Sequence, residues 1–214
     1  MQLIMKKIIY IFFLTFSLYA QSQIINLTAE DDCNREVRNA YYSDADNSLD
    51  GFEGSWKYQN GNEILIITLR KILNAPNNLN SQDLLIGEYK YIDAGGNLIF
   101  DTLNDLNVNY TDQTMHSIFG NCVFSDYNYP EINFLDCIPT MKKVKLLHFY
   151  ENLGGGPIYM AIKNQGSINQ IKIYINTDTN NYQTTTDVDG YEDLIVTPTN
   201  RILIPNGYYV LTKI

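Results

Sequence analysis

Two short acidic segments hold the side chains best suited to bind a metal. The first is Asp44-Ala45-Asp46-Asn47-Ser48, and the second, Asp187–Asp193, clusters four carboxylates around a glycine. Carboxylate oxygens suit Ca²⁺, and an EF-hand loop needs oxygen donors at positions 1, 3 and 5 and glycine at position 6. In the second segment Tyr191 stands at position 5 and Gly190 comes two places early, while in the first Leu49 replaces the glycine. We therefore expect solvated acidic turns and predict no metal site.

The two histidines, His116 and His148, are the candidate acids or bases. Neither lies in a metal-ligand spacing such as H-x-x-x-H, and no serine stands in a G-x-S-x-G motif. His148 falls within an alternating strand pattern, which favours a packed or surface strand position. Carboxylate pairs serve glycoside hydrolysis only when they face each other across a cleft, which a sequence does not show. We predict no catalytic residue and no cofactor, and a secreted hydrolase on a β scaffold remains the alternative to a binding function.

Tyrosine supplies the chain's main potential for binding. There are 17 tyrosines, and several fall in pairs or near pairs: Tyr41, Tyr42, Tyr127, Tyr129, Tyr208 and Tyr209. Tyrosine buries a large area at a small entropic cost, so it stacks on sugars and enriches protein interfaces, although it is also a good strand former. The composition therefore favours a non-enzymatic binding or interaction protein, whose partner is an unknown small molecule or an exported protein.

The elements that must position these residues are almost all strands. Trp56 and Tyr58 alternate with polar residues, Asn60-Gly61 is a strong two-residue hairpin signal, and 63–72 is rich in branched residues. Further strands are expected at 84–92, 98–102, 143–150, 157–163, 170–175, 201–204 and 208–213. The glycine run Gly154–Pro157 precedes a strand rather than a helix, so it predicts a flexible hairpin turn and not a phosphate site.

This spacing of strands predicts an all-β protein. We expect a single antiparallel barrel or sandwich over residues 51–214, with a lipocalin-like barrel favoured, because a closed sheet protects its strand edges. A poorly packed lead segment over residues 23–50 should precede it. A capping-box match at 28–31 allows one short helix over 34–42.

The first 22 residues have the features of a secretory signal peptide. Two lysines precede an apolar run over 8–18, and Ala20-Gln21-Ser22 offers a small-x-small cleavage site. The run is about 11 residues, short of the roughly 20 that a transmembrane helix needs. We therefore expect residues 1–22 to be removed, the exported chain to begin at Gln23 in the periplasm or outside the cell, and no transmembrane segment.

Charge argues against nucleic acid as a partner. The chain has a net charge of −9, and loss of Lys6 and Lys7 with the leader leaves 13 basic and 24 acidic residues, a net charge of −11. Such an acidic surface repels a polyanion, and no basic run offsets the repulsion.

Three cysteines in an exported chain suggest a disulfide. Cys122 and Cys137 give the shortest closure, and a bridge across a loop of some 15 residues would stabilise the fold by about 3 kcal/mol. Cys33 is then left unpaired. The alternative is that all three are buried thiols without a bridge.

Gly54-Ser55-Trp56 resembles the Gly-x-Trp start of lipocalin-like barrels, where the tryptophan seals one end and a late basic residue packs on it. The resemblance implies structural roles for Gly54 and Trp56, with Arg201 or Lys213 as the packing partner. Taken alone, Trp56 equally fits an ordinary core aromatic.

A wider resemblance is carried by residues 49–57, by 85–92 (LIGEYKYI) and by the ending Leu211-Thr212-Lys213. These segments are similar to an uncharacterised secreted family of flavobacterial proteins, domain-of-unknown-function family 6705. The similarity spans most of the mature chain, and it implies no activity and no catalytic residues.

Overall fold

The computed structural model describes residues 23–29, 33, 35, 37–124, 132, 134, 137, 142–150, 154–163, 170–176 and 204–214, with the backbone alone at 149, 150 and 154. The expected signal peptide (1–22), the second acidic segment (187–193), Arg201, Tyr127 and Tyr129 lie outside these residues, as does part of the expected helix over 34–42.

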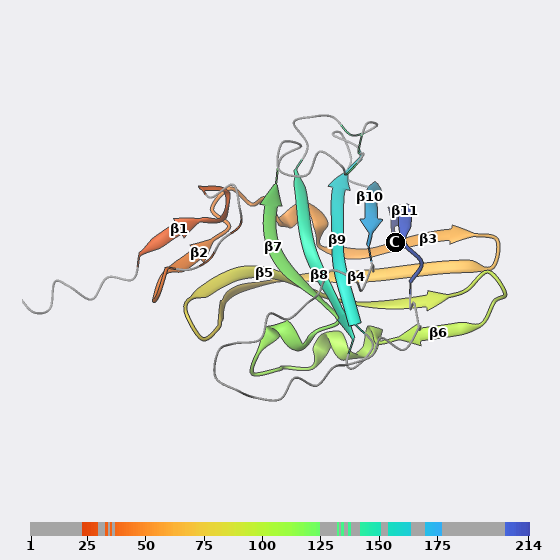
Figure 1. Ribbon diagram of the computed structural model, residues 1–214, viewed down its shortest axis with the longest axis horizontal. Helices are drawn as coiled ribbons and strands as arrows, with labels where there is room; N and C mark the ends of the chain where they lie inside the picture. Colours follow the sequence, from red (N-terminus) through yellow and green to blue (C-terminus); the bar gives the residue numbers. More distant parts are fainter. Residues whose placement is uncertain are drawn as a thin grey trace, which may run out of the picture.

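Eight antiparallel strands close into a barrel (Figure 1). They are β3 (Gly54–Asn60), β4 (Glu63–Pro76), β5 (Ser81–Ile92), β7 (Ile118–Phe124), β8 (Lys143–Tyr150), β9 (Gly154–Ile162), β10 (Gln170–Ile175) and β11 (Gly207–Lys213). Each barrel strand pairs with the next along the chain, and β11 pairs back with β3. The predicted all-β barrel is confirmed, and its ring leaves none of the eight strands at a free edge.

Side-chain alternation along the strands fills the barrel. Leu65, Ile67 and Leu69 of β4 are buried and belong to the main core, because successive side chains of a strand point to opposite faces. The β3–β4 hairpin forms as predicted, but its turn is Gly61-Asn62, one residue later than expected. Gly61 has φ 59°, a conformation that glycine adopts at little cost.

The glycine run that was expected to be a turn is instead strand. Residues 154–157 pair with 147–150 as the first part of β9. Two of them, Gly155 and Gly156, are buried. The prediction was wrong because it judged the glycines by their backbone freedom, whereas here their backbone is held by pairing with β8.

The lead segment packs on the barrel, contrary to expectation. Strand β1 (Ile24–Asn26) pairs in parallel with β2 (Tyr41–Ser43), and β2 pairs with the start of β5. Leu27, Tyr42 and Leu49 are fully buried in the main core. Residues 37–42 form a turn and strand β2 rather than a helix. In Figure 1 this segment lies at the opposite side of the barrel from the β3–β4 turn and β6.

A short strand and two turns flank β5. Strand β6 (Leu98–Asp101) pairs with the end of β5 within the sheet, and the 3₁₀ turns η3 (Leu103–Asn107) and η4 (Gln113–Met115) follow it. Leu106 of η3 packs against the buried cluster of Ala75, Leu84 and Ile86 on the outer face. Two further 3₁₀ turns, η1 (Leu27–Ala29) and η2 (Asp50–Phe52), belong to the lead segment and the entry to β3. Among the described residues, no helix has the length and apolar character needed to cross a bilayer.

Candidate ligand-binding site at one end of the barrel

One end of the barrel, which we call the tryptophan end, is plugged by side chains around Trp56. The indole is fully buried, its Nε1 donates to the Phe52 carbonyl at 2.8 Å, and the Lys213 ammonium lies 5.1 Å from the ring centroid. Gly54 has φ 113°, and a Cβ there would lie 2.7 Å from Lys213 Cε. The glycine therefore leaves room for the lysine to reach the indole. Lys213 is one of the two packing partners that the Gly-x-Trp resemblance implied, and the other, Arg201, lies outside the described residues.

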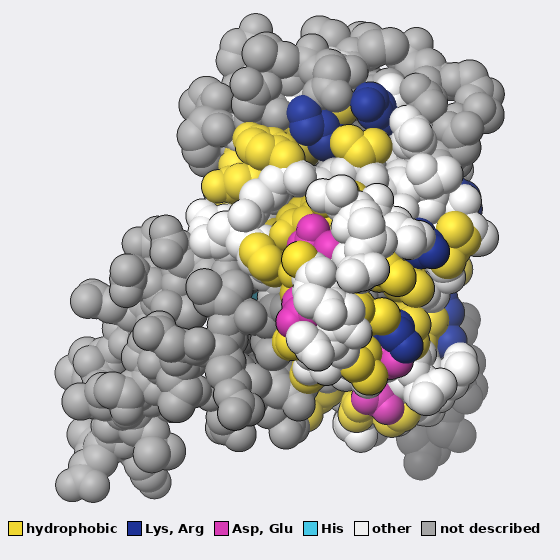
Figure 2. Space-filling model, turned by 90° about the vertical axis from the view of Figure 1, so that its right-hand side faces the viewer, with side chains coloured by type: hydrophobic (Ala, Val, Ile, Leu, Met, Phe, Trp, Pro, Cys, Tyr) yellow, Lys and Arg dark blue, Asp and Glu magenta, His cyan; other side chains and the backbone are white. Residues whose placement is uncertain are grey.

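The opposite end, which we call the tyrosine end, carries polar side chains on the inner face of the barrel. Glu63 shares the inward face of β4 with the buried Leu65, and Tyr58 and Tyr91 lie opposite Leu65 in the register. The Tyr209 ring meets the Tyr58 ring edge-on at 5.0 Å, and Tyr89 lies two residues further along β5 toward the middle of the barrel. Figure 2 views the molecule from the side of the β3–β4 turn and β6, where hydrophobic and acidic side chains are mixed on the surface.

Glu63 holds two phenols of the tyrosine end. Tyr91 Oη donates to Glu63 Oε1 at 2.9 Å, and Tyr58 Oη donates to Oε2 at 3.4 Å. Burial, together with the hydrogen bond to Glu63, raises the pKa of Tyr91. Burial and the Glu63 charge raise the pKa of Tyr209 to about 12. Its hydroxyl donates to the Pro205 carbonyl at 2.7 Å. The phenols of Tyr91 and Tyr209 therefore stay protonated at neutral pH.

His148 is on the inner face of β8, between Ile118 and Gly156 on the neighbouring strands. It is 2% exposed, and its ring meets the Tyr89 ring edge-on at a centroid distance of 5.6 Å. Burial lowers the pKa of His148 to about 4, so the ring is neutral at pH 7. Neither ring nitrogen has a hydrogen-bond partner among the described residues.

Two glycines face inward at the tyrosine end. Gly156 lies directly opposite His148, so β9 contributes no side chain beside the imidazole. Gly207 pairs with the buried Ile175, and a Cβ built on Gly207 would have no heavy atom within 4 Å. At these two positions the inner face of the tyrosine end therefore carries no side chain.

His116, the other candidate base, lies outside the barrel, beside the outer face of β5. Its Nδ1 lies 2.8 Å from Oε1 of the buried Glu88, and the Ser117 hydroxyl donates to Glu88 Oε2 at 2.5 Å. Because the serine bonds the carboxylate and not the imidazole, the three residues do not form a nucleophile and base pair. Their contacts satisfy a buried carboxylate, which is a structural role.

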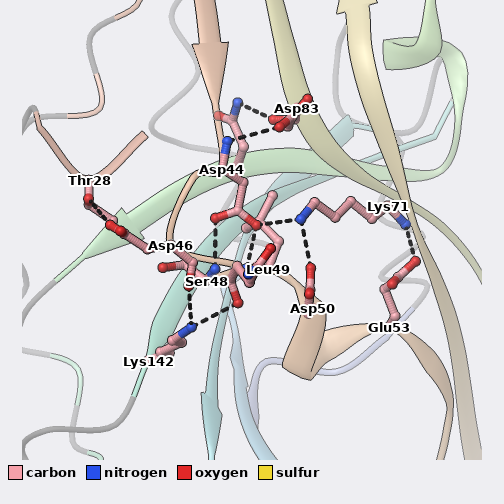
Figure 3. A network of polar contacts seen from close by, with 12 residues as sticks. Thr28, Asp44, Asp46, Ser48, Leu49, Asp50, Glu53, Lys71, Asp83 and Lys142 are labelled. Atoms are coloured by element: carbon pink, nitrogen blue, oxygen red, sulfur yellow. Dashed lines mark hydrogen bonds and ion pairs between the residues drawn. The ribbon is translucent and has the colours of Figure 1, made fainter. Parts of the chain in front are cut away.

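The first acidic segment is not a solvated turn. Asp44 has a fully buried side chain that accepts hydrogen bonds from the Ser48 and Leu49 amides at 2.7 and 3.0 Å, and from Lys71 Nζ at 2.7 Å (Figure 3). Lys71 also contacts Asp50 at 2.6 Å. Burial opposes the lysine charge, but these two carboxylates outweigh it and raise the Lys71 pKa. The ammonium thus occupies the place at Asp44 where a cation would bind.

Other contacts tie the same turn to its surroundings. Asp83 accepts from the Asp44 amide and from Tyr41 Oη, at 2.9 and 2.6 Å. Asp46 remains exposed, accepts from Thr28 Oγ1, and has its pKa lowered by that bond. In the described part of the chain, no group of three or more His, Cys, Asp or Glu side chains is arranged to hold a metal.

The disulfide joins Cys33 to Cys122, with Cα atoms 5.2 Å apart and a sequence separation of 89, so the predicted Cys122–Cys137 bridge is wrong. Cys122 lies opposite Lys145 on the outer side of β7. There Cys33 of the lead segment meets it, while Cys137 is a buried thiol packed in a separate cluster with Phe124. Choosing the pair that closes the shortest loop gave the wrong answer, because the folded structure and not the distance along the sequence determines which cysteines come together.

A cavity of about 320 Å³ lies beside this bridge on the outer surface. Leu84, Phe119, Leu147 and both bridged cysteines are among its lining residues. It lies on the outer face of the barrel and is separate from the tyrosine end.

Sequence reasoning identified His148 but missed Glu63, Tyr89 and Tyr91 as site residues. The signal that could have found Glu63 was the alternation of inward and outward side chains along β4. Glu63 falls in the same alternating series as Leu65 and Ile67, which places a carboxylate on the buried face.

The comparisons with known proteins assign the chain to a family without assigning an activity. The model of the family of unknown function DUF6705 matches residues 1–213, and the chain belongs to that family. The resemblance to this family is therefore confirmed. No curated protein and no solved structure matches the chain.

Proposed function

We propose that this member of the DUF6705 family is an exported, non-enzymatic binding protein that holds a small ligand at the tyrosine end of its barrel. The observation that carries the proposal is the difference between the two ends. Packed side chains around Trp56 plug one end, whereas phenols, a carboxylate and a buried imidazole face inward at the other. Mostly apolar walls with a few convergent polar groups are typical of small-molecule sites.

The same geometry supports binding over the alternative of glycoside hydrolysis. Hydrolysis of that kind uses two carboxyl groups facing each other across the scissile bond. At the tyrosine end, Glu63 is already engaged by Tyr91 and Tyr58. Asp44 and Glu88 are held by structural partners elsewhere in the fold. The hydrolase alternative therefore has no specific support from the described residues.

Export is supported by two independent features. The first 22 residues have the pattern of a signal peptide, and the Cys33–Cys122 bridge is of the kind that persists in oxidising compartments. Mass spectrometry of the protein recovered from periplasm and medium should give an N-terminus at Gln23. Recovery only from the cytoplasm, with residues 1–22 intact, would contradict export.

The binding site can be tested with two adjacent tyrosines of β11. Tyr209 is 6% exposed at the tyrosine end, whereas Tyr208 is 43% exposed on the outer face. The probe is N-phenyl-1-naphthylamine, a neutral dye that fluoresces in apolar surroundings. Tyr209→Ala should weaken dye binding on the order of tenfold, because an aromatic wall is lost. Tyr208→Ala is the matched control and should leave the affinity within about twofold.

Circular dichroism and thermal melting establish that both variants are folded. Absence of saturable dye binding, or equal losses in the two variants, would contradict a site at the tyrosine end.

A further inference from the structure

The cavity beside the disulfide has the size and the lining of a small-molecule site. Its volume is about 320 Å³, and ligand pockets commonly measure about 300 to 1,000 Å³. Leu84, Phe119 and Leu147 supply apolar lining, together with the disulfide itself. Gln82 and Asn121 place two amide side chains in the same lining. Mostly apolar walls with a few polar groups are the usual composition of such sites.

A β-bulge in β7 helps to shape this cavity. The register of β7 with β8 shifts by one residue between Phe119 and Cys122. The bulge contains Gly120, whose φ of 145° is rare for other residues and where a Cβ would lie 3.2 Å from Leu146 Cα. Bulges change the direction of a side chain and are frequent beside functional sites. Here the bulge carries Asn121, which reaches toward the start of β5.

The main chain fixes the orientation of both amides. Asn121 Nδ2 donates to the Asp83 carbonyl at 2.8 Å and to Gln82 Oε1 at 2.9 Å. Because a carbonyl oxygen only accepts, turning the Asn121 amide over would lose the bond to Asp83. Turning the Gln82 amide over would place two NH₂ groups against each other. Both hydrogens of the Asn121 amide are therefore used, as is the Gln82 oxygen.

This arrangement leaves one acceptor and one donor for another molecule. Asn121 Oδ1 and Gln82 Nε2 have no hydrogen-bond partner among the described residues. Unlike the nitrogens of His148, neither atom is sealed from solvent. Asn121 is only 8% exposed, and the cavity is the open space that its side chain lines. A guest in the cavity can therefore reach both atoms.

The charges at the cavity favour an uncharged guest. Of the described side chains that line it, only Lys145 carries a charge, and its ammonium lies 5.8 Å from the Tyr159 ring centroid, on the side of β9. The acidic chain, with its net charge of −9, repels anions. A carboxamide is uncharged and offers one carbonyl acceptor and N–H donors, so it complements the donor of Gln82 and the acceptor of Asn121.

We infer that the cavity beside the disulfide is a second binding site, and that it takes an apolar ring bearing a carboxamide group. The carboxamide N–H donates to Asn121 Oδ1, its carbonyl accepts from Gln82 Nε2, and the ring packs on Leu84, Phe119 and Leu147. This site is separate from the tyrosine end, so the inference goes beyond the proposed function.

Three probes of similar shape test the ligand class by calorimetric titration into the chain with its disulfide intact: 2-naphthamide, methyl 2-naphthoate and 2-naphthoate. The ester keeps the carbonyl but has no N–H for Asn121. We expect the amide to bind about fivefold more tightly than the ester, as one net hydrogen bond allows. The anion should bind at least about fivefold more weakly than the amide, because it has no donor and places a charge beside the Asn121 oxygen.

Three variants locate the site. Gln82→Glu keeps an oxygen for Asn121 Nδ2 but replaces the free donor with an acceptor, so ester affinity should fall at least about fivefold. Leu147→Trp should fill the cavity and abolish binding of all three probes. Tyr209→Ala is the control at the tyrosine end, and it should leave amide affinity within about twofold. Circular dichroism and thermal melting establish that each variant is folded.

Each outcome supports or overturns the inference. If no probe binds, or if folded Leu147→Trp binds the amide as wild type does, the cavity is not a binding site. A loss confined to Tyr209→Ala would place the probes at the tyrosine end instead. If the ester matches the amide, or if 2-naphthoate binds most tightly, the ligand class is overturned. Unchanged ester affinity in Gln82→Glu would overturn the role of Gln82.

Discussion

Replacing His148 with leucine should flatten the dependence of stability on pH between about pH 4 and 6.5. Burial lowers the pKa of His148 from its ordinary 6.5 to about 4. In the unfolded chain the histidine binds a proton below pH 6.5, whereas in the folded chain it does so only near pH 4. Protons therefore favour the unfolded state across this window, and stability falls as the pH is lowered. Each pKa unit is worth about 1.4 kcal/mol, so His148 alone removes about 3 kcal/mol of unfolding free energy between neutral pH and pH 4.

Urea unfolding followed by Trp56 fluorescence at pH 4, 5, 6 and 7 measures this effect. All other ionisable groups are common to the two proteins, so their contributions cancel in the difference between wild type and His148→Leu. We expect the variant to gain about 3 kcal/mol relative to wild type as the pH falls from 7 to 4. Parallel curves would show that the imidazole protonates as readily in the folded chain as in the unfolded one, which would refute its burial inside the barrel.

Three further perturbations test the fold around the site. Cys33→Ser should lower the unfolding free energy by about 4 to 5 kcal/mol, as expected for opening a loop of 89 residues, whereas Cys137→Ser should leave the bridge intact in a non-reducing peptide map. Trp56→Ala should cost about 3 to 5 kcal/mol in urea unfolding, because it empties a fully buried site. Lys71→Met should cost about 3 to 5 kcal/mol, because it leaves the Asp44 carboxylate buried without its cation, and Asp44→Asn with Lys71→Met should recover part of that loss. A single-variant cost below about 1 kcal/mol at either site would contradict the packing described for it.

Strand content was predictable because it depends on local patterns. The branched run of β4 and the inward series Leu65, Ile67 and Leu69 repeat with the period of a strand, and the Gly61 hairpin lies between two such runs. A barrel whose strands pair in chain order requires little beyond these local signals. The packing of Lys213 on Trp56 joins the first barrel strand to the last, so the Gly-x-Trp resemblance, and not a local pattern, pointed to it.

The lead segment and the disulfide were not predictable, because both depend on contacts between residues far apart in the chain. Asp44 looks like part of an exposed acidic turn until Lys71, 27 residues away, is brought within 2.7 Å of it. Cys33 meets Cys122 only after the lead segment has packed against the barrel. Local composition shows that a turn contains polar side chains, but it does not show which distant residue will pair with them and bury them.

The distribution of stabilising contacts gives a physical reason to place function at the tyrosine end. The Lys71 ion pairs and the packing of Lys213 on Trp56 both lie toward the tryptophan end, where buried charges have partners. At the other end His148 remains buried with two nitrogens that no described residue satisfies. Proteins tolerate local disagreement with the rules of stable packing mainly where function requires it. A barrel that is closed by packed side chains at one end can bear that cost at the other, and this contrast supports the proposal of a binding site at the tyrosine end.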